Sequence, residues 1–497
     1  MTYSQNTPWG EGLIYRRGPM PPAPAIYQAA LSIARHLREA GHQAWFAGGC
    51  VRDLHLGIAP KDYDVATSAT PDQVLSLFPK TFAVGAHFGV ILVCTPQPDA
   101  PDIATEVATF RHDGAYSDGR RPDAVQFSSS PEEDVLRRDF TINGMLLDPL
   151  AYETTGDLAA ATLDLVHGID DLAARVIRAI GQPKLRFAED KLRMLRAVRF
   201  AARLGYRIQD DTAAAIRNQA AEIHQVSQER IRDELTRILT EGGARRGFEL
   251  LDSLGLLAHV LPETLRMHGV QQPPQYHPEG DVWTHTMLLL EKLPSGASPT
   301  VAWGALLHDI GKPATFQPPD PNRPGDRIRF NRHVEVGVRI AEEILRRLRF
   351  SNEDTAQILA LVKNHMRFGD IREMRESTLR RFLRLPHFDE HLALHRLDVT
   401  SSHDDLSLYD FARAEYEREP APDLRPHPLL TGRDLIDAGY APSPQFKAML
   451  TLAEDAQLER SIHTREEALA LVQRSFPLPS KPATRSPSRF EIENTPH

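Results

Sequence analysis

The sequence has little cysteine and no long apolar run. Its 497 residues include only Cys50 and Cys94, which excludes a disulfide framework and a metal cluster built from thiolates. No stretch of 18 apolar residues occurs, so we expect no transmembrane helix. The N-terminal residues lack the apolar core of a secretory signal. We therefore expect a cytoplasmic protein with no membrane partner.

Positive charge is not in excess over the whole chain, but it is concentrated in one segment. The formal net charge of −9 argues against a uniformly basic surface that binds nucleic acid. Between Arg175 and Arg207, however, ten lysines or arginines accompany only two acids, Glu189 and Asp190. A solvated helix face usually mixes its signs. This segment therefore predicts a surface that meets phosphate groups.

The hydrophobic pattern changes along the chain from strand-like to helical. Short apolar runs at 44–47, 61–67, 88–94 and 103–110 predict strands, and a capping box from Thr70 to Gln73 predicts a helix start. After about residue 165, apolar residues recur at spacings of three and four, as in helices. We predict an α+β head made of a sheet with helices, followed by an elongated all-α body and a second all-α domain.

Composition and pattern suggest six segments, consistent with about 150 residues per folded domain. They are a disordered tail (1–22), the head (23–165), a helical neck and body (166–268), the second all-α domain (269–410), a C-terminal helical element (411–476) and a disordered tail (477–497).

Two aspartates in the head have the spacing of a metal site. Asp62 and Asp64 lie two apart on a predicted strand, so their carboxylates face the same way. Such a pair can hold two divalent cations for in-line displacement at phosphorus. Upstream, Gly48 and Gly49 let the backbone approach a phosphate, and Arg52 adds a charge-assisted contact. The alternative is a surface strand beside an ordinary glycine turn.

Further polar residues extend this candidate site. Glu106, on a predicted neighbouring strand, is a possible third acid. In the segment RRDFTINGM (137–145), Arg138 could hold a triphosphate, and Asp139 and Asn143 could contact ribose hydroxyls. In isolation, this segment is also typical of an ion-paired helix start.

A row of arginines follows on a helix that we expect to open at Glu189. Arg193, Arg196 and Arg203 fall with Glu189 within an arc of about 80°. Like charges three or four residues apart on a helix repel, so this row of arginines would destabilise the helix if it faced only solvent. Asp190 could accept from the amine of cytosine or adenine while Arg193 donates to the ring nitrogen. The alternative is a salt bridge between Asp190 and Arg193 along the helix.

The motifs together resemble a known family. They occur in sequence order as GGCVRD (48–53), KDYDVAT (61–67), TFRHDGAYSDGRRPDAVQF (109–127), RRDFTINGM (137–145), EDKLRMLRAVRFAARLG (189–205) and ERIRDEL (229–235). Over roughly residues 40–265 the chain resembles the bacterial class II tRNA nucleotidyltransferase and poly(A) polymerase family. The resemblance implies a nucleotidyltransferase palm, and addition of CCA to tRNA 3′ ends from CTP and ATP without a nucleic-acid template.

The resemblance also implies roles for individual residues. It gives Mg²⁺ binding and catalysis to Asp62 and Asp64, and base selection to Asp190 and Arg193. The positions that match nucleotide contacts are Gly49, Arg52, Arg138, Arg196 and Arg199, and Gly48 and Asp139 join them as candidate contacts from the residues alone. The segment 111–121, with Arg111, Asp113 and Arg120, corresponds to a mobile region that helps to switch from C to A. One departure is Gly144, where the family usually has alanine.

The second all-α domain contains an ordered set of histidines and aspartates. The set consists of His285, His308, Asp309, His333, His365 and Asp398. Such residues on separate helices supply nitrogen and oxygen ligands for one or two divalent metals, which can activate water. Lone histidines are usually structural, but this ordered set is far less expected by chance. We expect His277 to lie in a loop beside the site, and Lys312 to be a possible phosphate contact.

This domain resembles the HD phosphohydrolase superfamily. The resemblance implies hydrolysis of phosphomonoesters and 2′,3′-cyclic phosphates with Mg²⁺ or a divalent transition metal. Residues 431–450 resemble a small helical element that follows such domains and packs on the body or touches RNA.

The sequence leaves several functions open. The leading hypothesis is a CCA-adding tRNA nucleotidyltransferase with an HD phosphohydrolase domain. A poly(A) polymerase, or a partial enzyme that adds only CC or only A, shares the same motifs. Two further alternatives are a metal phosphohydrolase with a vestigial head and an RNA-binding module without catalysis.

Overall fold

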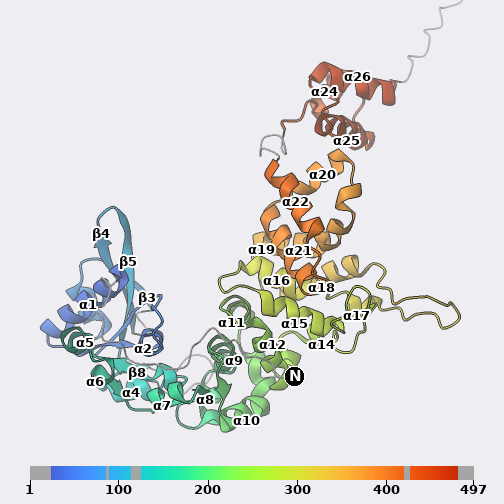
Figure 1. The fold of residues 1–497 in the computed structure, drawn as a ribbon. Coiled ribbons are helices and arrows are strands. Elements are labelled where there is room, and N and C mark those ends of the chain that lie inside the picture. The colour runs from blue at the N-terminus through green and yellow to red at the C-terminus, as the bar shows by residue number, and fades with distance from the viewer. Residues whose placement is uncertain (1–23, 86–88, 114–124, 419–425, 479–497) are drawn as a thin grey trace, which may run out of the picture. The chain divides into compact units, whose positions relative to one another are not determined.

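The chain divides into two compact units, Met1–Leu265 and Arg266–His497. The structure, a computed structural model, describes residues 24–85, 89–113, 125–418 and 426–478 (Figure 1). The disordered tails expected at 1–22 and 477–497 lie outside the described residues, except for positions 477 and 478. Within the described ranges, no helix is both long enough and apolar enough to cross a membrane.

The head is built on a seven-stranded sheet with the order β3-β4-β5-β2-β1-β8-β9. The strands are β1 Ala44–Ala47, β2 Asp64–Thr67, β3 Thr81–Gly85, β4 Val90–Gln97, β5 Ala100–Thr109, β8 Met145–Leu147 and β9 Thr162–Asp164. Of the described pairs in this sheet, β2 with β5 is parallel and the others are antiparallel. Figure 1 shows β4 and β5 extending as a hairpin. The strand expected at 61–67 begins only at Asp64, so Asp62 precedes it.

Helices surround the sheet, and three of them begin at a side chain that caps the first turn. They are α1 Ala25–Glu39, α2 Gly49–His55, α3 Pro71–Leu77, α4 Pro131–Leu136, α5 Pro149–Thr155, α6 Leu158–Ala161 and α7 Gly168–Ala173. The expected capping box is confirmed, because Thr70 and Gln73 exchange side-chain and backbone hydrogen bonds at the start of α3. Helix α1 buries Ala30, Ala34 and Leu37, its apolar stripe. Two short strands, β6 Arg111–Asp113 and β7 Val125–Phe127, pair beside the main sheet.

The rest of the first unit is helical, as the apolar spacing predicts. It contains α8 Pro183–Glu189, α9 Leu192–Leu204, α10 Asp210–Gln219, α11 Gln228–Thr240, α12 Ala244–Ser253, α13 Leu257–Val260 and α14 Pro262–Leu265. Two strands of two residues each, β10 Val176–Ile177 and β11 Arg207–Ile208, pair in parallel. Helix α9 is the centre of this region, with Met194, Ala197 and Val198 fully buried.

The expectation that a single helix opens at Glu189 is wrong. Glu189 ends α8, and Asp190 has extended backbone angles, φ −141° and ψ 107°. The carboxylate of Asp190 accepts a hydrogen bond from the backbone N–H of Leu192 at 3.0 Å. Aspartate competes in this way with helical hydrogen bonding, so it interrupts the helix and starts a new one. The arginine row of α9 therefore begins without Glu189 in its helix.

The regular elements in the described part of the second unit are helices. Its main helices are α15 Val282–Lys292, α16 Pro299–Leu307, α17 Lys312–Thr315, α18 His333–Arg347, α19 Asn352–Asn364, α20 Glu376–Leu383, α21 Phe388–Thr400 and α22 Ser407–Arg418. Helix α16 is buried on all sides from Val301 to Leu307, and its Trp303 is fully buried. The boundary expected after residue 410 falls inside α22, whose Ala412 joins the apolar cluster of Phe368 and Phe382.

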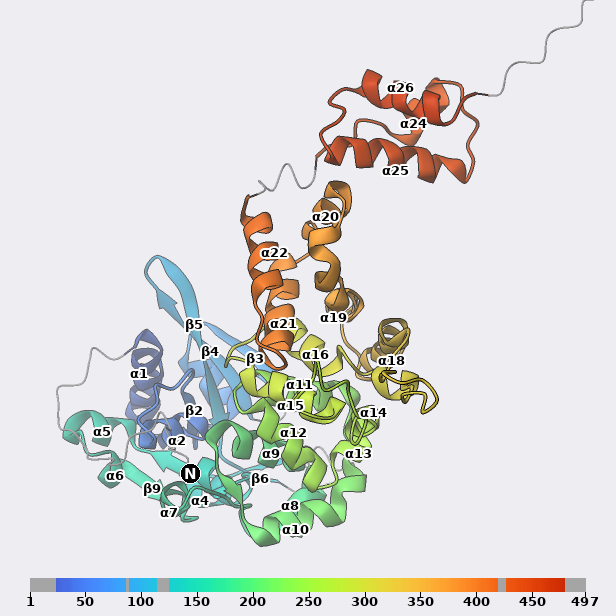
Figure 2. The same cartoon turned by 45° about the vertical axis from the view of Figure 1, so that its right-hand side comes forward.

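From residue 426 to residue 478, which the structure describes, the C-terminal element contains three helices. They are α24 Gly432–Asp437, α25 Gln445–Leu458 and α26 Arg465–Ser475, and they lie together in Figure 2. Leu435, Met449 and Val472 are buried in an apolar cluster of their own. This element therefore has a small core in addition to its contacts within the unit.

Helices α9 and α12 approach so closely that glycine is required at Gly243. A Cβ atom there would lie 2.4 Å from the carbonyl oxygen of Ala202, and the backbone has φ +74°. Gly205 is a matched control, because it has φ +68° but its added Cβ would meet no described atom within 4 Å. We expect Gly205→Ala to cost about 1 kcal/mol from backbone strain alone, and Gly243→Ala to cost clearly more. Thermal unfolding followed by circular dichroism measures the difference, and equal losses would contradict the close approach.

Candidate functional site

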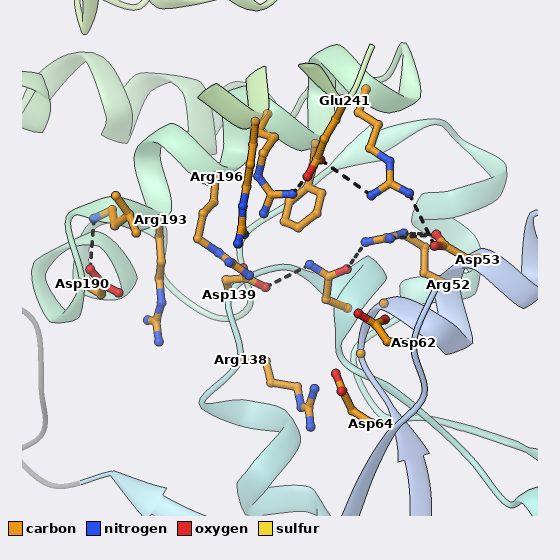
Figure 3. A pocket seen from close by; sticks show the side chains of 18 of the residues that line it. Arg52, Asp53, Asp62, Asp64, Arg138, Asp139, Asp190, Arg193, Arg196 and Glu241 are labelled. Atoms are coloured by element: carbon orange, nitrogen blue, oxygen red, sulfur yellow. Dashed lines mark hydrogen bonds and ion pairs between the residues drawn. The ribbon is translucent and has the colours of Figure 1, made fainter. Parts of the chain in front are cut away.

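One cavity of the first unit, about 590 Å³ in volume, collects the residues that the head motifs predict. All the predicted catalytic and nucleotide-binding residues line it, from Gly48 near the N-terminal end of the chain to Arg199 on α9. Ten basic and six acidic side chains face this space, so its lining has a positive excess. Figure 3 shows the arginines of α9 opposite the two aspartates at β2. The roles of these residues remain predictions.

The carboxylates of the predicted metal pair lie together at the start of β2. The parallel pairing of β2 with β5 sets Val65 opposite Val107, which brings Asp64 beside Glu106. Burial, and next the charges of Glu106 and Asp62, raise the pKa of Asp64 to about 7 although Arg138 opposes the shift. A bound cation would relieve this repulsion, and carboxylate oxygens are the donors that Mg²⁺ prefers. The residues therefore fit a magnesium site.

The glycine turn permits a close approach at the edge of the cavity. Gly48 has φ +76°, and a Cβ there would lie 3.2 Å from Nη1 of Arg138. Arg52, in the first turns of α2, is buried and donates to Asn143 at 2.7 Å and to Asp53 at 2.8 Å. Gly48 thus leaves room for Arg138, while Arg52 joins α2 to the segment around Asn143.

Asp139 is a buried junction beneath the arginine row. Its Oδ2 accepts from Arg196 at 2.6 Å, and its Oδ1 accepts from the side-chain amide of Asn143 at 3.1 Å. Burial opposes ionisation, but Arg196 and Asn143 outweigh it and lower the pKa of Asp139 to about 2. Asp139 and Asn143, which we expected to contact ribose, are thus already bonded to each other.

Acids that the sequence analysis missed hold the rest of the arginine row. Arg199 donates to Glu234 at 2.7 Å and to Glu241 at 3.1 Å. Arg203 lies 3.5 Å from Asp53 and 3.8 Å from Glu241. Glu234 belongs to ERIRDEL, a motif that the sequence does single out, but nothing in the sequence gives its partner 35 residues away.

The proposed base-selecting pair does not form the ordinary salt bridge along a helix. Arg193 instead donates to Glu189 at 2.6 Å, and Asp190 pairs with Arg230 at 2.8 Å. The alternative of an Asp190–Arg193 salt bridge is therefore wrong, because the break between α8 and α9 turns the two side chains to different partners. Arg230, on α11, is a second residue that the sequence analysis missed.

The segment expected to switch the base is only partly described. Arg111 lies on β6, at the end of that strand nearest to β5. Residues 114–124, which include Arg120, and the side chain of Asp113 lie outside the described part of the chain.

In the second unit, the other five predicted ligands gather around Asp309. Its Oδ2 lies 3.2 Å from Nε2 of His308 and 4.0 Å from Nε2 of His285. Its Oδ1 lies 3.8 Å from Nε2 of His333 and 3.7 Å from Nε2 of His365. The sixth residue, Asp398, approaches Nε2 of His285 at 3.1 Å.

The polar atoms of this cluster fit a metal centre. The Nδ1 atoms of His308, His333 and His365 face the backbone carbonyls of Ala305, Phe330 and Val362 at 2.7–2.9 Å. Each Nδ1 must therefore carry the proton, which leaves a lone pair on Nε2. Among the described residues, these three buried Nε2 atoms, and Oδ1 of Asp309, have no hydrogen-bond partner. Buried lone pairs of this kind are what a metal ion satisfies.

The ionisation states agree with this chemistry. Burial lowers the pKa of His365 to about 4 and also lowers that of His333, so both rings are neutral, the form that binds metal. Burial also acts against a charge on His285, but Asp398 and Glu279 outweigh it and raise the pKa of His285 to about 9. A metal ion would replace that extra proton, because it supplies positive charge at the same nitrogen.

Glu279 is a further residue that the sequence analysis missed. Its Oε1 lies 2.7 Å from Nδ1 of His285 and 2.9 Å from Nδ1 of His277. A carboxylate behind a ligand histidine fixes the orientation of its ring. His277 lies in the loop before α15, as expected, and Lys312 contacts Oδ2 of Asp309 at 2.7 Å. A glutamate six residues before a histidine, in a loop, has no periodic signal that would reveal this contact.

Comparison with protein families identifies three matching regions. Residues 44–178 match the model of the poly A polymerase head domain. Residues 205–267 match the model described as the probable RNA and SrmB-binding site of polymerase A. Residues 280–403 match the HD domain.

Curated relatives and a solved structure agree with these regions. The chain is 41% identical over 234 residues to the CCA-adding enzyme of Geobacillus stearothermophilus, which is 47% of this chain and 54% of that relative. It is 35% identical over 280 residues to the CCA-adding enzyme of Lactobacillus johnsonii, covering 56% of this chain and 67% of that relative. The chain thus spans about half the length of the first of these relatives.

The solved structure extends the likeness to most of the fold. The Bacillus stearothermophilus CCA-adding enzyme in complex with CTP has a TM-score of 0.67 and 26% identity. The match covers 92% of this chain and 98% of that one. The α+β head with an all-α body and HD domain is thereby confirmed.

The buried ion pair of Asp139 predicts a pH-dependent contribution to stability. Its folded-state pKa of about 2 is below the ordinary value of 3.8, so the stabilisation is complete above about pH 4 and is lost as pH falls toward 2. We expect Asp139→Asn to lower the free energy of unfolding by about 2 kcal/mol at pH 7 and by about half as much at pH 3. Thermal unfolding at both pH values measures this. The exposed Glu39→Gln is the control, and an effect of Asp139→Asn that does not change with pH would contradict the ion pair.

Proposed function

Because the chain belongs to the family of CCA-adding enzymes, we propose that it adds C, C and A to the 3′ ends of tRNA from CTP and ATP, without a nucleic-acid template. The observation that carries this proposal is the single cavity in which Asp62 and Asp64 face the arginine row of α9. Two acids beside a surplus of basic groups suit a reaction that transfers a nucleotide and releases pyrophosphate.

In this mechanism, Asp62 and Asp64 would hold Mg²⁺. When bound, Mg²⁺ lowers the pKa of the attacking 3′-hydroxyl and offsets the charge of the phosphates. Arg138 lies beside the aspartates and binds the triphosphate of the incoming nucleotide. Arg196 is oriented by Asp139, so it presents its remaining N–H groups in a fixed direction.

Base selection would rest on Asp190 and Arg193. A carboxylate accepts a hydrogen bond from the amine of cytosine or adenine, while the guanidinium group donates to the adjacent ring nitrogen. Uracil and guanine present a carbonyl oxygen and an N–H at these positions, so the same pair rejects them. This chemistry supports the use of CTP and ATP by one site.

The aspartate pair predicts complete loss of transfer when it is neutralised. The substrate is a tRNA transcript that lacks its 3′ CCA, supplied with Mg²⁺, CTP and ATP. We expect Asp62→Asn and Asp64→Asn to lower the rate at least about a thousandfold, because the site then loses the charge that binds the metal. Glu39→Gln, an exposed acid on α1, is the control and should leave the rate unchanged.

Sequencing of the products separates the alternatives. Ordered addition of C, C and A, with a stop, supports the proposal. Unlimited addition of A indicates a poly(A) polymerase, and a defined partial product indicates a CC-adding or A-adding enzyme. No addition by the unaltered chain would favour the vestigial head, or an RNA-binding module if hydrolysis is absent as well.

A second activity is favoured by the cluster around Asp309. We propose a phosphohydrolase that acts on phosphomonoesters and 2′,3′-cyclic phosphates. The two carboxylate oxygens of Asp309 face different ligand sets, with His285, His308 and Asp398 on one side and His333 and His365 on the other. These two ligand sets would each be able to hold one divalent ion. When bound, divalent ions make water nucleophilic near neutral pH.

The types of the predicted ligands indicate which metal the second unit prefers. Four of the six ligands are imidazole nitrogens, which favour divalent transition metals over Mg²⁺.

We also propose a cytoplasmic location, since both cysteines, Cys50 and Cys94, are free thiols.

The two ligand sets predict the metal content of the second unit. In a chain carrying Asp62→Asn and Asp64→Asn, we expect about two Ni²⁺ or Mn²⁺ ions per molecule after loading and dialysis. His365→Ala removes a ligand from one side only, so it should lose about one ion and most of the hydrolysis of 2′,3′-cyclic AMP. Elemental analysis and a phosphate-release assay measure both. His463→Ala, an exposed histidine, is the control, and a single ion in the parent chain would contradict the presence of two separate ligand sets.

A further inference from the structure

Lys312 is a buried cation beside the metal cluster of the second unit. It is 6% exposed, and its ammonium group lies 2.7 Å from Oδ2 of Asp309. The same nitrogen lies 5.4 Å from the centroid of the Phe330 ring. A second hydrogen bond joins it to Gln272, whose side-chain oxygen accepts from Nζ at 2.6 Å. A buried charge requires such partners, because it has lost most of its hydration.

The side-chain amide of Gln272 has one orientation that suits Lys312. An ammonium group donates hydrogen bonds and accepts none, so the oxygen of the amide must face it and the amine cannot. The amine, Nε2, is buried and has no hydrogen-bond partner among the described residues. An unpaired buried donor is unfavourable, and each such group in a folded protein requires an explanation. Here the side chain leaves its amine unpaired while its oxygen holds Lys312.

The backbone around Gln272 is fixed without its side chain. In the loop before α15, Gln271 and Asp281 form an antiparallel bridge, and the N–H of Val282 donates to the carbonyl of Val270 at 3.0 Å. A change of the Gln272 side chain should therefore leave the loop in place. Gln271 is exposed, so it provides a control of the same residue type one position away.

We propose that Gln272 is a positioning residue that holds Lys312 in place to bind a phosphate group of the substrate. This inference rests on the phosphohydrolase activity proposed above and adds a residue to its substrate recognition. Once Asp309 binds divalent ions, its carboxylate attracts the ammonium group less, and the ions repel it. The uncharged oxygen of Gln272 then keeps Lys312 at the edge of the cluster, where its remaining N–H can donate to a phosphate oxygen.

The consequence of losing Gln272 follows from the shape of lysine. Four flexible carbons carry the ammonium group, so it has no fixed place once a partner is removed. A contact between Lys312 and phosphate is present in the bound substrate as well as in the transition state. Its loss should therefore raise KM more than it lowers kcat.

Hydrolysis of 2′,3′-cyclic AMP tests this role. In the chain carrying Asp62→Asn and Asp64→Asn, loaded with Mn²⁺, we expect Gln272→Met to raise KM at least about tenfold and to change kcat by less than about twofold. Methionine is similar in length but offers no oxygen to Lys312. Gln271→Met should keep both constants. A fall in kcat with KM unchanged would overturn the proposal.

Phosphate binding gives a second measurement that needs no turnover. Bound Mn²⁺ is paramagnetic, so it speeds the ³¹P relaxation of inorganic phosphate that lies close to it. We expect Gln272→Met and Lys312→Met each to raise the phosphate dissociation constant at least about tenfold, and Gln271→Met to leave it unchanged. Gln272→Met should keep the Mn²⁺ content of the parent chain. A loss of bound metal would overturn the proposal, because the side chain would then act on the metal ligands.

A double-mutant cycle shows whether Gln272 acts through Lys312. In a chain that carries Lys312→Met, adding Gln272→Met should raise the phosphate dissociation constant no further. An additive effect would show that Gln272 acts independently of Lys312 and would overturn the proposal. The double variant contains no unpaired cation at this place, so it tests the coupling even if Gln272→Met alone is less stable. Circular dichroism at the assay temperature shows that each variant is folded.

The two measurements separate this inference from the proposed activity. If the unaltered chain binds Mn²⁺ and phosphate but hydrolyses no cyclic phosphate, the proposed activity fails, and phosphate binding still decides the role of Gln272. If hydrolysis occurs and Gln272→Met keeps both KM and the phosphate dissociation constant, the role of Gln272 fails and the activity stands. A chain that binds no Mn²⁺ would overturn both.

Discussion

The pairing of buried guanidinium groups with carboxylates is the interaction on which the first unit depends. A buried charge without a partner costs several kcal/mol, so Arg193, Arg199 and Arg52 each meet an acid. The acids do not cancel the bases, because ten basic side chains line the cavity against six acidic ones. The pairs instead fix the direction of each guanidinium group before a substrate arrives, which is the arrangement that stabilises developing charge most effectively.

The second unit follows the opposite electrostatic rule. Around Asp309 the neighbours are imidazole rings, and burial keeps two of them neutral by lowering the pKa of His333 and His365. Backbone carbonyls satisfy Nδ1 of His308, His333 and His365. The Nε2 atoms of these rings have no hydrogen-bond partner among the described residues. The arginine row of the first unit thus finds carboxylate partners within the chain, whereas the inner ligand atoms around Asp309 are left for a metal to satisfy.

The sequence predicts the groups that do chemistry better than it predicts the groups that hold them. Asp62, Asp64 and the six predicted metal ligands of the second unit belong to short motifs, so their residue types and spacing can be recognised in the sequence. Glu234, Glu279 and Arg230 act through side-chain contacts that form only in the folded chain, and no periodic pattern marks them. The start of α9 was mispredicted for a similar reason, because a hydrogen bond from Leu192 to Asp190 outweighs helical periodicity.

The parallel pairing of β2 with β5 constrains how the head can change during evolution. Side chains alternate between the two faces of a strand, so a slip of one residue in β5 would turn Glu106 away from Asp64. The turn between β4 and β5, around residues 98 and 99, lies at the far end of the same hairpin. Insertions at that turn leave the pairing of β2 with β5 intact. The tip of the hairpin can therefore vary in length while Glu106 keeps its position beside Asp64.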